Sequence, residues 1–242
     1  MTTVAVLAEP PRPGRAFPAL TPSPLTESEA AALYAAAMGD VCAAVEASGA
    51  ELLVNYRETD AGDDESAVRD ALEGALSDPS AARYEVQVGS TPSARVGNTV
   101  THLLEREEVR TAAAVTPATA LLARSDIDSA AMKLRSSDVV LGPTTDGRVY
   151  YAGFAAPIDF ADALATPAVE TLVDRALAAD LSVDFLPTLP VIETPADLRT
   201  VVPQMRARRA AGRRVPERTA DALADLGLAV EDRDGEVVLR RE

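Results

Sequence analysis

The sequence predicts an α/β protein of three layers, with a mixed but mostly parallel sheet between helices on both faces. Short apolar runs, of the kind buried on both faces of a sheet, alternate with helical stretches along most of the chain. The first unit reads strand, loop, helix, strand, and such a crossover makes the two strands parallel. With 242 residues, 47% of them hydrophobic, the chain can bury the core of one large domain.

The first unit is the clearest. VAVLA (residues 4–8) is an uninterrupted apolar run bounded by proline, as expected for a buried strand, and ELLVNY (residues 51–56) is a second. Between them the sequence predicts a helix that begins at Thr26, a good N-cap with Glu29 three residues later, and ends at Gly49. Its apolar face consists of Ala30, Leu33, Ala37, Val41 and Val45.

The alternation continues to about residue 187. We expect helices near 65–76, 93–106, 125–134 and 166–180, and strands at 83–88, 111–115, 138–143, 148–154 and 182–187. The TTDG segment between two of these strands is short enough for a hairpin-like reversal. Strand 148–154 is therefore expected to be the antiparallel member of the sheet.

The end of the chain has a different pattern. A helix from about Pro195 runs into the arginine-rich MRARRAAGRR, RTADALADLG suggests another helix, and an Asp234-Gly235 turn suggests a hairpin. We expect a main domain over residues 1–203 and a small appendage over 204–242.

The charge is strongly acidic. The formal net charge is −15, the sequence pI is about 4.5, and Lys133 is the only lysine. Because the acidic residues are spread along the whole chain, we favour a halophilic protein whose carboxylate-rich surface stays hydrated in concentrated salt. The alternative is an acidic protein with a basic partner.

Other features point to a cytoplasmic protein without a membrane anchor. Cys42 is the only cysteine, which excludes an intrachain disulfide and a cysteine-based metal site. The N-terminal apolar stretch is too short for a signal sequence or a membrane span. His102 is the only histidine, and we interpret it as structural.

The loop after the first strand, EPPRPGR, is the first candidate binding element. It follows the carboxyl end of a parallel strand, where open α/β sheets bind ligands. Prolines stiffen the loop, Gly14 allows a close approach of the backbone, and Arg15 could pair with a phosphate. The residues assigned to nucleotide binding here are Glu9, Pro10, Pro13, Gly14 and Arg15. An ordinary proline-containing connection explains the same letters equally well.

Three stretches resemble an uncharacterised, glycosyltransferase-like family with the GT-A fold of nucleotide-diphospho-sugar transferases. VAVLAEPPRPGR is similar to an apolar strand followed by K-x-P-x-P-G-x-x-K-T-R-L. DVVLGPTTDGRVYYAGF is similar to V-V-L-G-P-A-x-D-G-G-Y-Y-L-I-G, and LPTLPVIETPADL to L-P-x-x-x-D-V-D-T-P-E-D-L. The family is related to molybdenum-cofactor and phospholactate nucleotidyltransferases, and the likeness covers most of residues 1–200.

The departures from these motifs fall on residues that would contact a nucleotide. Phe17, Pro18 and Ala19 replace the Lys-Thr-Arg run that such enzymes direct at phosphates. In place of an aspartate that the resemblance implies as a metal ligand stands Ala118, whose methyl group cannot bind a hard cation. The final family aspartate becomes Glu193.

The resemblance implies further site residues. Asp146, in the TTDG turn, and Glu193 are expected on the substrate or acceptor side, with Asp146 as a candidate metal ligand; an Asp-Gly turn that caps itself explains Asp146 as well. Tyr150 and Tyr151 alternate across a strand, so we expect one in the core and Tyr150 at the edge of a cleft.

QVGSTPSARVGNT takes the place of a family loop that reads Q-x-x-G-x-L-G-x-R. Gly97 and Asn98 keep part of its character, and Asn98 is assigned to the base or ribose of a nucleotide. An ordinary loop between a strand and a helix, with Thr91 or Ser93 as the N-cap, is the alternative.

Two functions remain open at this point. The first is a glycosyltransferase-like or nucleotidyltransferase-like protein that binds a nucleotide or nucleotide sugar at the carboxyl ends of its strands, with Mg²⁺ or Mn²⁺ as cofactor if it is active. The second is a catalytically degenerate binding or regulatory protein on the same fold, favoured by the replacements at 17, 19 and 118. The arginines at 206–214 have no interleaved aromatic residues, so contacts within the chain or between subunits are favoured over nucleic acid. A homo-oligomer stays open.

Overall fold

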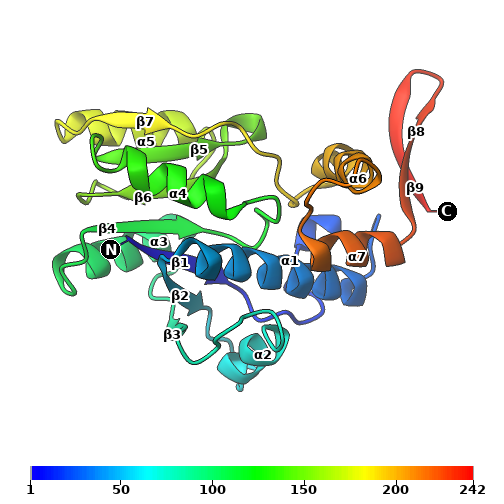
Figure 1. The fold of residues 1–242 in the computed structure, drawn as a ribbon, viewed down its shortest axis with the longest axis horizontal. Coiled ribbons are helices and arrows are strands. Elements are labelled where there is room, and N and C mark those ends of the chain that lie inside the picture. Colours follow the sequence, from blue (N-terminus) through cyan, green and yellow to red (C-terminus); the bar gives the residue numbers. More distant parts are fainter. Residues whose placement is uncertain (1, 242) are drawn as a thin grey trace.

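A seven-stranded mixed sheet runs through the middle of the protein, with helices on both faces (Figure 1). The computed structural model describes residues 2–241. The strand order is β3-β2-β1-β4-β6-β5-β7, and only β6 is antiparallel to its neighbours. The strands are β1 (Thr2–Ala8), β2 (Glu51–Tyr56), β3 (Arg83–Val86), β4 (Thr111–Val115), β5 (Val139–Pro143), β6 (Val149–Phe154) and β7 (Val183–Phe185). The predicted fold class, including the antiparallel strand, is confirmed.

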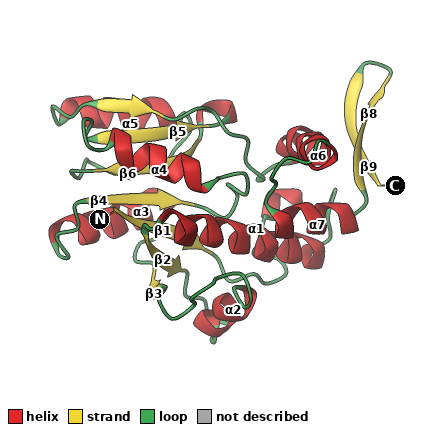
Figure 2. Ribbon diagram, in the orientation of Figure 1, coloured by secondary structure: helices red, strands yellow, loops and turns green. Residues whose placement is uncertain are grey.

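The helices form the two outer layers: in Figure 2 the yellow strands are stacked from top to bottom, with α1 and α4 in front of them and α3 and α5 behind. Apolar side chains of α1 and α4 belong to one buried cluster, and those of α3 and α5 belong to another. The helices are α1 (Glu27–Ser48), α2 (Asp64–Ala71), α3 (Pro92–Glu105), α4 (Arg124–Lys133), α5 (Ala168–Ala178), α6 (Pro195–Ala210) and α7 (Glu217–Asp225).

The two clusters are separated by the sheet because side chains alternate along each strand. In β1, Val4, Val6 and Ala8 lie in the cluster with α1, whereas Ala5 lies in the cluster with α3. Interior strands such as β1 are therefore apolar at successive positions, which is the signal that identified them in the sequence.

Helix α1 has the ends that the sequence predicts. Thr26 and Glu29 form a reciprocal capping box, and Gly49 ends the helix with a φ of 74°. Within residues 2–241, α1 is the one helix long and apolar enough to cross a membrane by length and composition. It packs on the sheet with ten buried residues, and it serves as a core helix of this fold.

Elements near the sheet edges are shorter than the sequence suggests. Helix α2 ends at Ala71 and not near 76, β3 ends at Val86, and β7 covers only 183–185. Both β3 and β7 are edge strands, paired on one side only. The apolar pattern of the sequence cannot show where an edge strand ends, because its end depends on how far it pairs with its single neighbouring strand.

The C-terminal region is joined to the main body by helices. The expected boundary at residue 204 falls inside α6, which continues to Ala210 and buries Met205. Helix α7 packs on α1, where the Asp40 carboxylate accepts 2.7 Å hydrogen bonds from the amide and the hydroxyl of Thr219. Asp40 thus caps the start of α7 from a different helix.

A two-stranded hairpin, β8 (Leu228–Arg233) and β9 (Glu236–Arg241), ends the chain and projects beside α6 (Figure 1). Its turn residues, Asp234 and Gly235, both have positive φ, as the Asp-Gly pair predicts. The Arg241 guanidinium returns to the Glu29 carboxylate at 2.7 Å, so the hairpin is tied to the start of α1.

Candidate functional site

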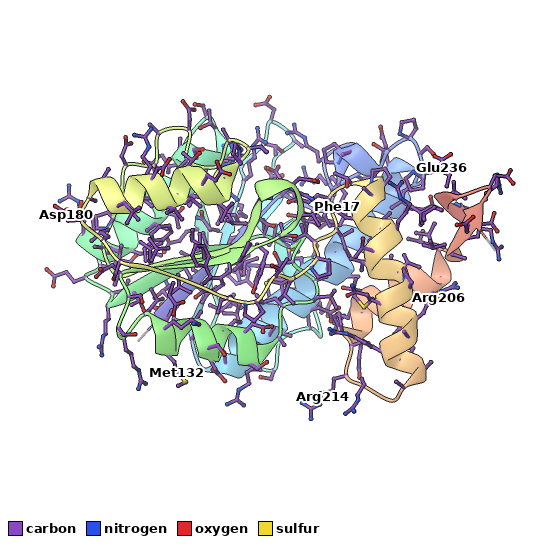
Figure 3. The ribbon with its side chains drawn as sticks, turned by 90° about the horizontal axis from the view of Figure 1, so that it is seen from above. Phe17, Met132, Asp180, Arg206, Arg214 and Glu236 are labelled. Atoms are coloured by element: carbon purple, nitrogen blue, oxygen red, sulfur yellow. The ribbon has the colours of Figure 1, made fainter. Side chains whose placement is uncertain are left out.

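A cavity of about 460 Å³ opens at the carboxyl ends of β1 and β4. This strand-end cavity lies where open α/β sheets bind ligands. In Figure 3, Phe17, one of its lining residues, is found toward the end of the molecule that carries α6, far from Asp180 at the other end. The cavity is lined by Leu7, Glu9, Arg15, Phe17, Pro18, Ala19, Tyr34, Gln87, Pro92, Arg95, Val96, Thr116, Pro117, Ala118, Leu164 and Glu193.

The loop after β1, residues 9–15, forms one wall of the cavity, and Arg12 holds it in place. Arg12 donates a 2.6 Å hydrogen bond to the carbonyl of Gly62 and lies 3.0 Å from the buried Asp64 carboxylate. Gly14 adopts a φ of 77°, which favours glycine, at the bend of the loop. Arg12 thus ties the loop to the segment at the start of α2, and Arg15, three residues later, lines the cavity.

An aromatic pair forms the floor below this loop. Phe17 has a φ of 45°, is buried, and meets the ring of Tyr34 edge to face with centroids 5.0 Å apart. The Tyr34 hydroxyl accepts a 2.7 Å hydrogen bond from the backbone amide of Glu9, the first residue after β1. Burial raises the pKa of Tyr34, so its hydroxyl stays neutral. The side of the cavity where the resembling family has basic residues is therefore apolar here.

Each carboxylate at the cavity has a cation behind it. Glu9 pairs with Arg57 at 3.2 Å. Glu193 pairs with Arg148 at 2.5 Å, and Arg148 also lies 2.9 Å from the buried Asp197. Burial opposes the charge of Arg148, but hydrogen bonds to Asp197 and Glu193 outweigh it and raise its pKa. Each of the two cavity carboxylates thus has a guanidinium partner within the protein.

The cavity guanidiniums are different. In residues 2–241 the structure shows no hydrogen bond or ion pair to the side chains of Arg15 and Arg95. Burial and repulsion by Arg57 lower the pKa of Arg95, and attraction by Glu9 offsets this only in part. Neither guanidinium has an anion in direct contact, and a ligand phosphate or carboxylate would supply one.

The expected metal position does not fit a divalent cation. The carbonyl of Ala118 accepts a 2.8 Å hydrogen bond from the amide of Ile192, which brings position 118 beside Glu193. Of the two carboxylate positions implied by the resemblance, one therefore carries a methyl group and the other carries a carboxylate held by Arg148. Among the described residues, no group of three or more His, Cys, Asp or Glu side chains could hold a metal ion. Mg²⁺ and Mn²⁺ require several oxygen ligands, and this position supplies few.

The structure brings several expected site residues together. Glu9, Arg15 and Glu193 line the cavity, as do the replaced positions Phe17, Ala19 and Ala118. Pro10, Pro13 and Gly14 belong to the loop but do not line the cavity, so they shape its wall without reaching its interior.

Neither Asp146 nor Tyr150 lines the strand-end cavity. Asp146 sits in a turn with a φ of 60°, its side chain 78% exposed, 3.6 Å from Arg148, and it does not line the cavity. Tyr150 is buried like Tyr151, and its hydroxyl donates a 2.9 Å hydrogen bond to the carbonyl of Pro187. Strand β6 is an interior strand covered on both faces, so both tyrosines pack in the core.

Gly97 and Asn98 also fall outside the cavity. Gly97 lies within α3 against Phe160, where a Cβ would approach the Phe160 Cβ to 2.6 Å. It is required for packing between α3 and the 158–162 loop. The Asn98 side chain donates a 2.8 Å hydrogen bond to the carbonyl of Val88, which secures the loop after β3.

Sequence reasoning missed Arg95 and Arg148. Counted from Gln87, Arg95 stands at the place of the arginine that closes the family loop Q-x-x-G-x-L-G-x-R, and this spacing could have identified it. Arg148 stands where the family stretch D-G-G has its second glycine. An arginine at a glycine position was a visible signal, but its partners at 193 and 197 are set by the tertiary fold.

Comparison with known proteins supports the fold. No family model matches the chain, and no curated protein sequence is significantly similar to it. A solved structure of a candidate nucleotide-diphospho-sugar transferase from Desulfovibrio desulfuricans G20 superposes with a TM-score of 0.76 at 20% identity, covering 93% of this chain and 94% of that one. The fold is therefore of the GT-A-like, nucleotide-diphospho-sugar transferase type.

Two further structures agree less closely. A cytidylyltransferase from Leptospira borgpetersenii gives a TM-score of 0.52 at 10% identity, covering 93% of this chain and 92% of that one. A 4-diphosphocytidyl-2C-methyl-D-erythritol synthase gives 0.50 at 13% identity, covering 83% and 97%. At these identities the likeness concerns the fold.

Proposed function

We propose that this protein binds a nucleotide or nucleotide sugar in the strand-end cavity, without a divalent cation, and acts as a binding or regulatory protein and not as a transferase. The observation that carries the proposal is the pair Ala118 and Glu193. A methyl group occupies one carboxylate position, and an internal arginine neutralises the other. In a transferase on this fold, carboxylates at these positions would help to hold the ion that balances the diphosphate leaving group.

Three features support binding. The cavity lies at the carboxyl ends of parallel strands, its volume suits a small ligand, and two guanidiniums without internal partners face it. The proteins that share the fold include a candidate nucleotide-diphospho-sugar transferase and a cytidylyltransferase. A phosphorylated ligand matches both the place and the charge of the two arginines.

The second candidate is transfer of a glycosyl or nucleotidyl group. Glu193 does line the cavity, and Mg²⁺ in nucleotide enzymes is often held by one or two carboxylates together with ligand phosphates. For that role Glu193 would have to exchange its 2.5 Å contact with Arg148 for the ion.

Isothermal titration with a panel of nucleotides and nucleotide sugars, in EDTA and separately in Mn²⁺, distinguishes the two candidates. The binding proposal expects the same affinity in both solutions and no release of diphosphate or sugar on prolonged incubation. Arg15→Ala should weaken binding by about 1.5–3 kcal/mol, the contribution of a hydrogen bond to a charged group. Arg124→Ala, on the exposed face of α4, is the matched control. Binding that requires Mn²⁺, followed by turnover, would establish the transferase instead.

A further inference from the structure

Two of the four charged side chains that line the strand-end cavity make no hydrogen bond or ion pair with other groups in residues 2–241. The lining contains two arginines, Arg15 and Arg95, and two carboxylates, Glu9 and Glu193. Arg57 pairs with Glu9, and Arg148 pairs with both Glu193 and Asp197. The lining carboxylates thus have partners that do not line the cavity, whereas the two lining guanidiniums are left to contact a ligand.

The surface between these charges is apolar. Phe17, Pro18 and Ala19 replace a run of residues that includes two cations in the resembling family, and Ala118 replaces a metal-binding aspartate. A third or fourth phosphate charge placed against these side chains would find no cation or hydrogen-bond donor among them. The cavity therefore suits a ligand with an uncharged body and a limited anionic group.

The cavity does not supply the side chains that would hold a metal ion to neutralise further negative charge on a ligand. Position 118 offers no oxygen ligand from its side chain, and Glu193 is engaged at 2.5 Å by Arg148. Arg15 and Arg95 are then the lining cations that can pair with negative charges on a ligand.

We propose that the cavity selects dianionic nucleotides, held by Arg15 and Arg95 without metal, and discriminates against nucleoside triphosphates. The inference rests on the proposed function and specifies its ligand. Two ligand types share the required chemistry: a nucleoside monophosphate, whose phosphate carries about two negative charges, and a nucleotide sugar, whose two bridged phosphates together carry about two. A free triphosphate carries about four and leaves about two unmatched.

The test is calorimetric titration of the full chain in EDTA, at one fixed KCl concentration at which the protein is folded. The probes are the monophosphates and triphosphates of the four common bases, together with UDP-glucose, GDP-mannose and ADP-glucose. For the base that binds, we expect the monophosphate or the nucleotide sugar to bind at least about tenfold more tightly than the triphosphate. Their relative affinities identify which of the two is the ligand.

Variants test the two arginines separately. Arg15→Gln and Arg95→Gln should each weaken dianion binding about tenfold to a hundredfold, because each removes a charged hydrogen-bond donor. Arg124→Gln on α4 should leave affinity unchanged. Ala19→Arg, at an exposed position of the lining, adds a third cation and should narrow the difference between triphosphate and dianion.

The outcomes separate the inference from the function on which it rests. A triphosphate that binds more tightly than its monophosphate and nucleotide sugar in EDTA overturns the charge selection and leaves nucleotide binding intact. Undiminished dianion binding by both arginine variants overturns the roles of Arg15 and Arg95. Absence of binding by every probe in EDTA overturns both proposals.

Discussion

Nη1 of Arg148 lies 2.5 Å from a carboxylate oxygen of Glu193, and this contact couples the cavity wall to the core. Nη2 of the same side chain lies 2.9 Å from Asp197, which is buried at the start of α6. Burial raises the pKa of Asp197, but the hydrogen bond and charge of Arg148 prevail and lower it. One arginine thus pairs with a cavity carboxylate and a buried helix-cap carboxylate together.

Loss of Arg148 should destabilise the fold. Arg148→Gln leaves Asp197 buried with no cation, and breaking such a pair by removing one partner typically costs about 3 kcal/mol. Because Asp197 keeps hydrogen bonds from the amides of Glu193 and Thr194, we expect about 2–3 kcal/mol in the free energy of unfolding, measured by urea titration. Arg124→Gln, which removes an exposed pair, should change it by less than about 1 kcal/mol. Equal effects of the two variants would contradict the coupling.

Ala118→Asp should create a metal site that the natural sequence lacks. The new carboxylate would stand beside Glu193, and two close carboxylates repel until a cation binds. We expect a lower melting temperature than wild type in EDTA and recovery on addition of Mn²⁺, whereas wild type should show the same melting temperature in both. Ala118→Asn supplies the volume without the charge. If Mn²⁺ leaves the melting temperature of the aspartate variant unchanged, positions 118 and 193 do not form a metal pair.

Removal of the Asp40 carboxylate should loosen the C-terminal region. Asp40→Ala deletes the hydrogen bonds to the amide and hydroxyl of Thr219 at the start of α7, and loss of a helix cap costs about 1–2 kcal/mol. Hydrogen exchange should accelerate in residues 217–241 more than in the sheet. Asp40→Asn retains an acceptor oxygen and should lie between wild type and the alanine variant. Uniform acceleration over the whole chain would show that Asp40 stabilises the fold globally.

Acid should detach the hairpin. Hydrogen bonds from Arg241 and the cap at Thr26 lower the pKa of Glu29 from 4.5 to about 2. A carboxylate with a lowered pKa in the folded state contributes stability above its unfolded pKa, and that contribution is lost as the pH falls through about 2. Glu29→Gln should therefore melt below wild type at pH 6, with the gap closing between about pH 4.5 and pH 2. Glu236→Gln, at the exposed hairpin turn, should show no such closing gap.

Salt should stabilise the protein if its acidity is a halophilic adaptation. With a net charge of −15, repulsion between carboxylates grows as the Debye length rises beyond the ~3 Å found at molar salt. The melting temperature should then fall as KCl decreases from multimolar to dilute concentrations. A melting temperature independent of KCl would refute this interpretation and favour an acidic protein with a basic partner.

The sequence predicts most of the sheet because its signal is local. Apolar runs mark β1, β2, β4 and β5, and the cap residues of α1 mark both ends of that helix. The reversal between β5 and β6 follows from a short turn segment. The ends of β3 and β7 are less well predicted, because an edge strand stops where its single neighbour ceases to pair.

The candidate site is only partly predictable, since its residues come from distant loops. Motif spacing identifies Arg15, Ala118 and Glu193, and these do line one cavity. It also selects Tyr150, which is buried and does not line this cavity, because the alternation of a strand has the same pattern in a core as at a cleft. It also places a domain boundary inside α6, because a change in composition toward arginine does not interrupt a helix.

The sequence by itself determines the fold class and the order of the elements, because these depend on local patterns of apolar residues. It also determines that positions 17, 19 and 118 carry no basic or metal-binding side chain, because that depends only on residue chemistry. Only the tertiary structure decides which charges remain for a ligand. Arg148 reaches Glu193 across 45 residues of chain, and Arg57 reaches Glu9 across 48. Pairing at such separations depends on how the crossovers bring strand ends together, so the two unpaired arginines become visible only when the sheet is assembled.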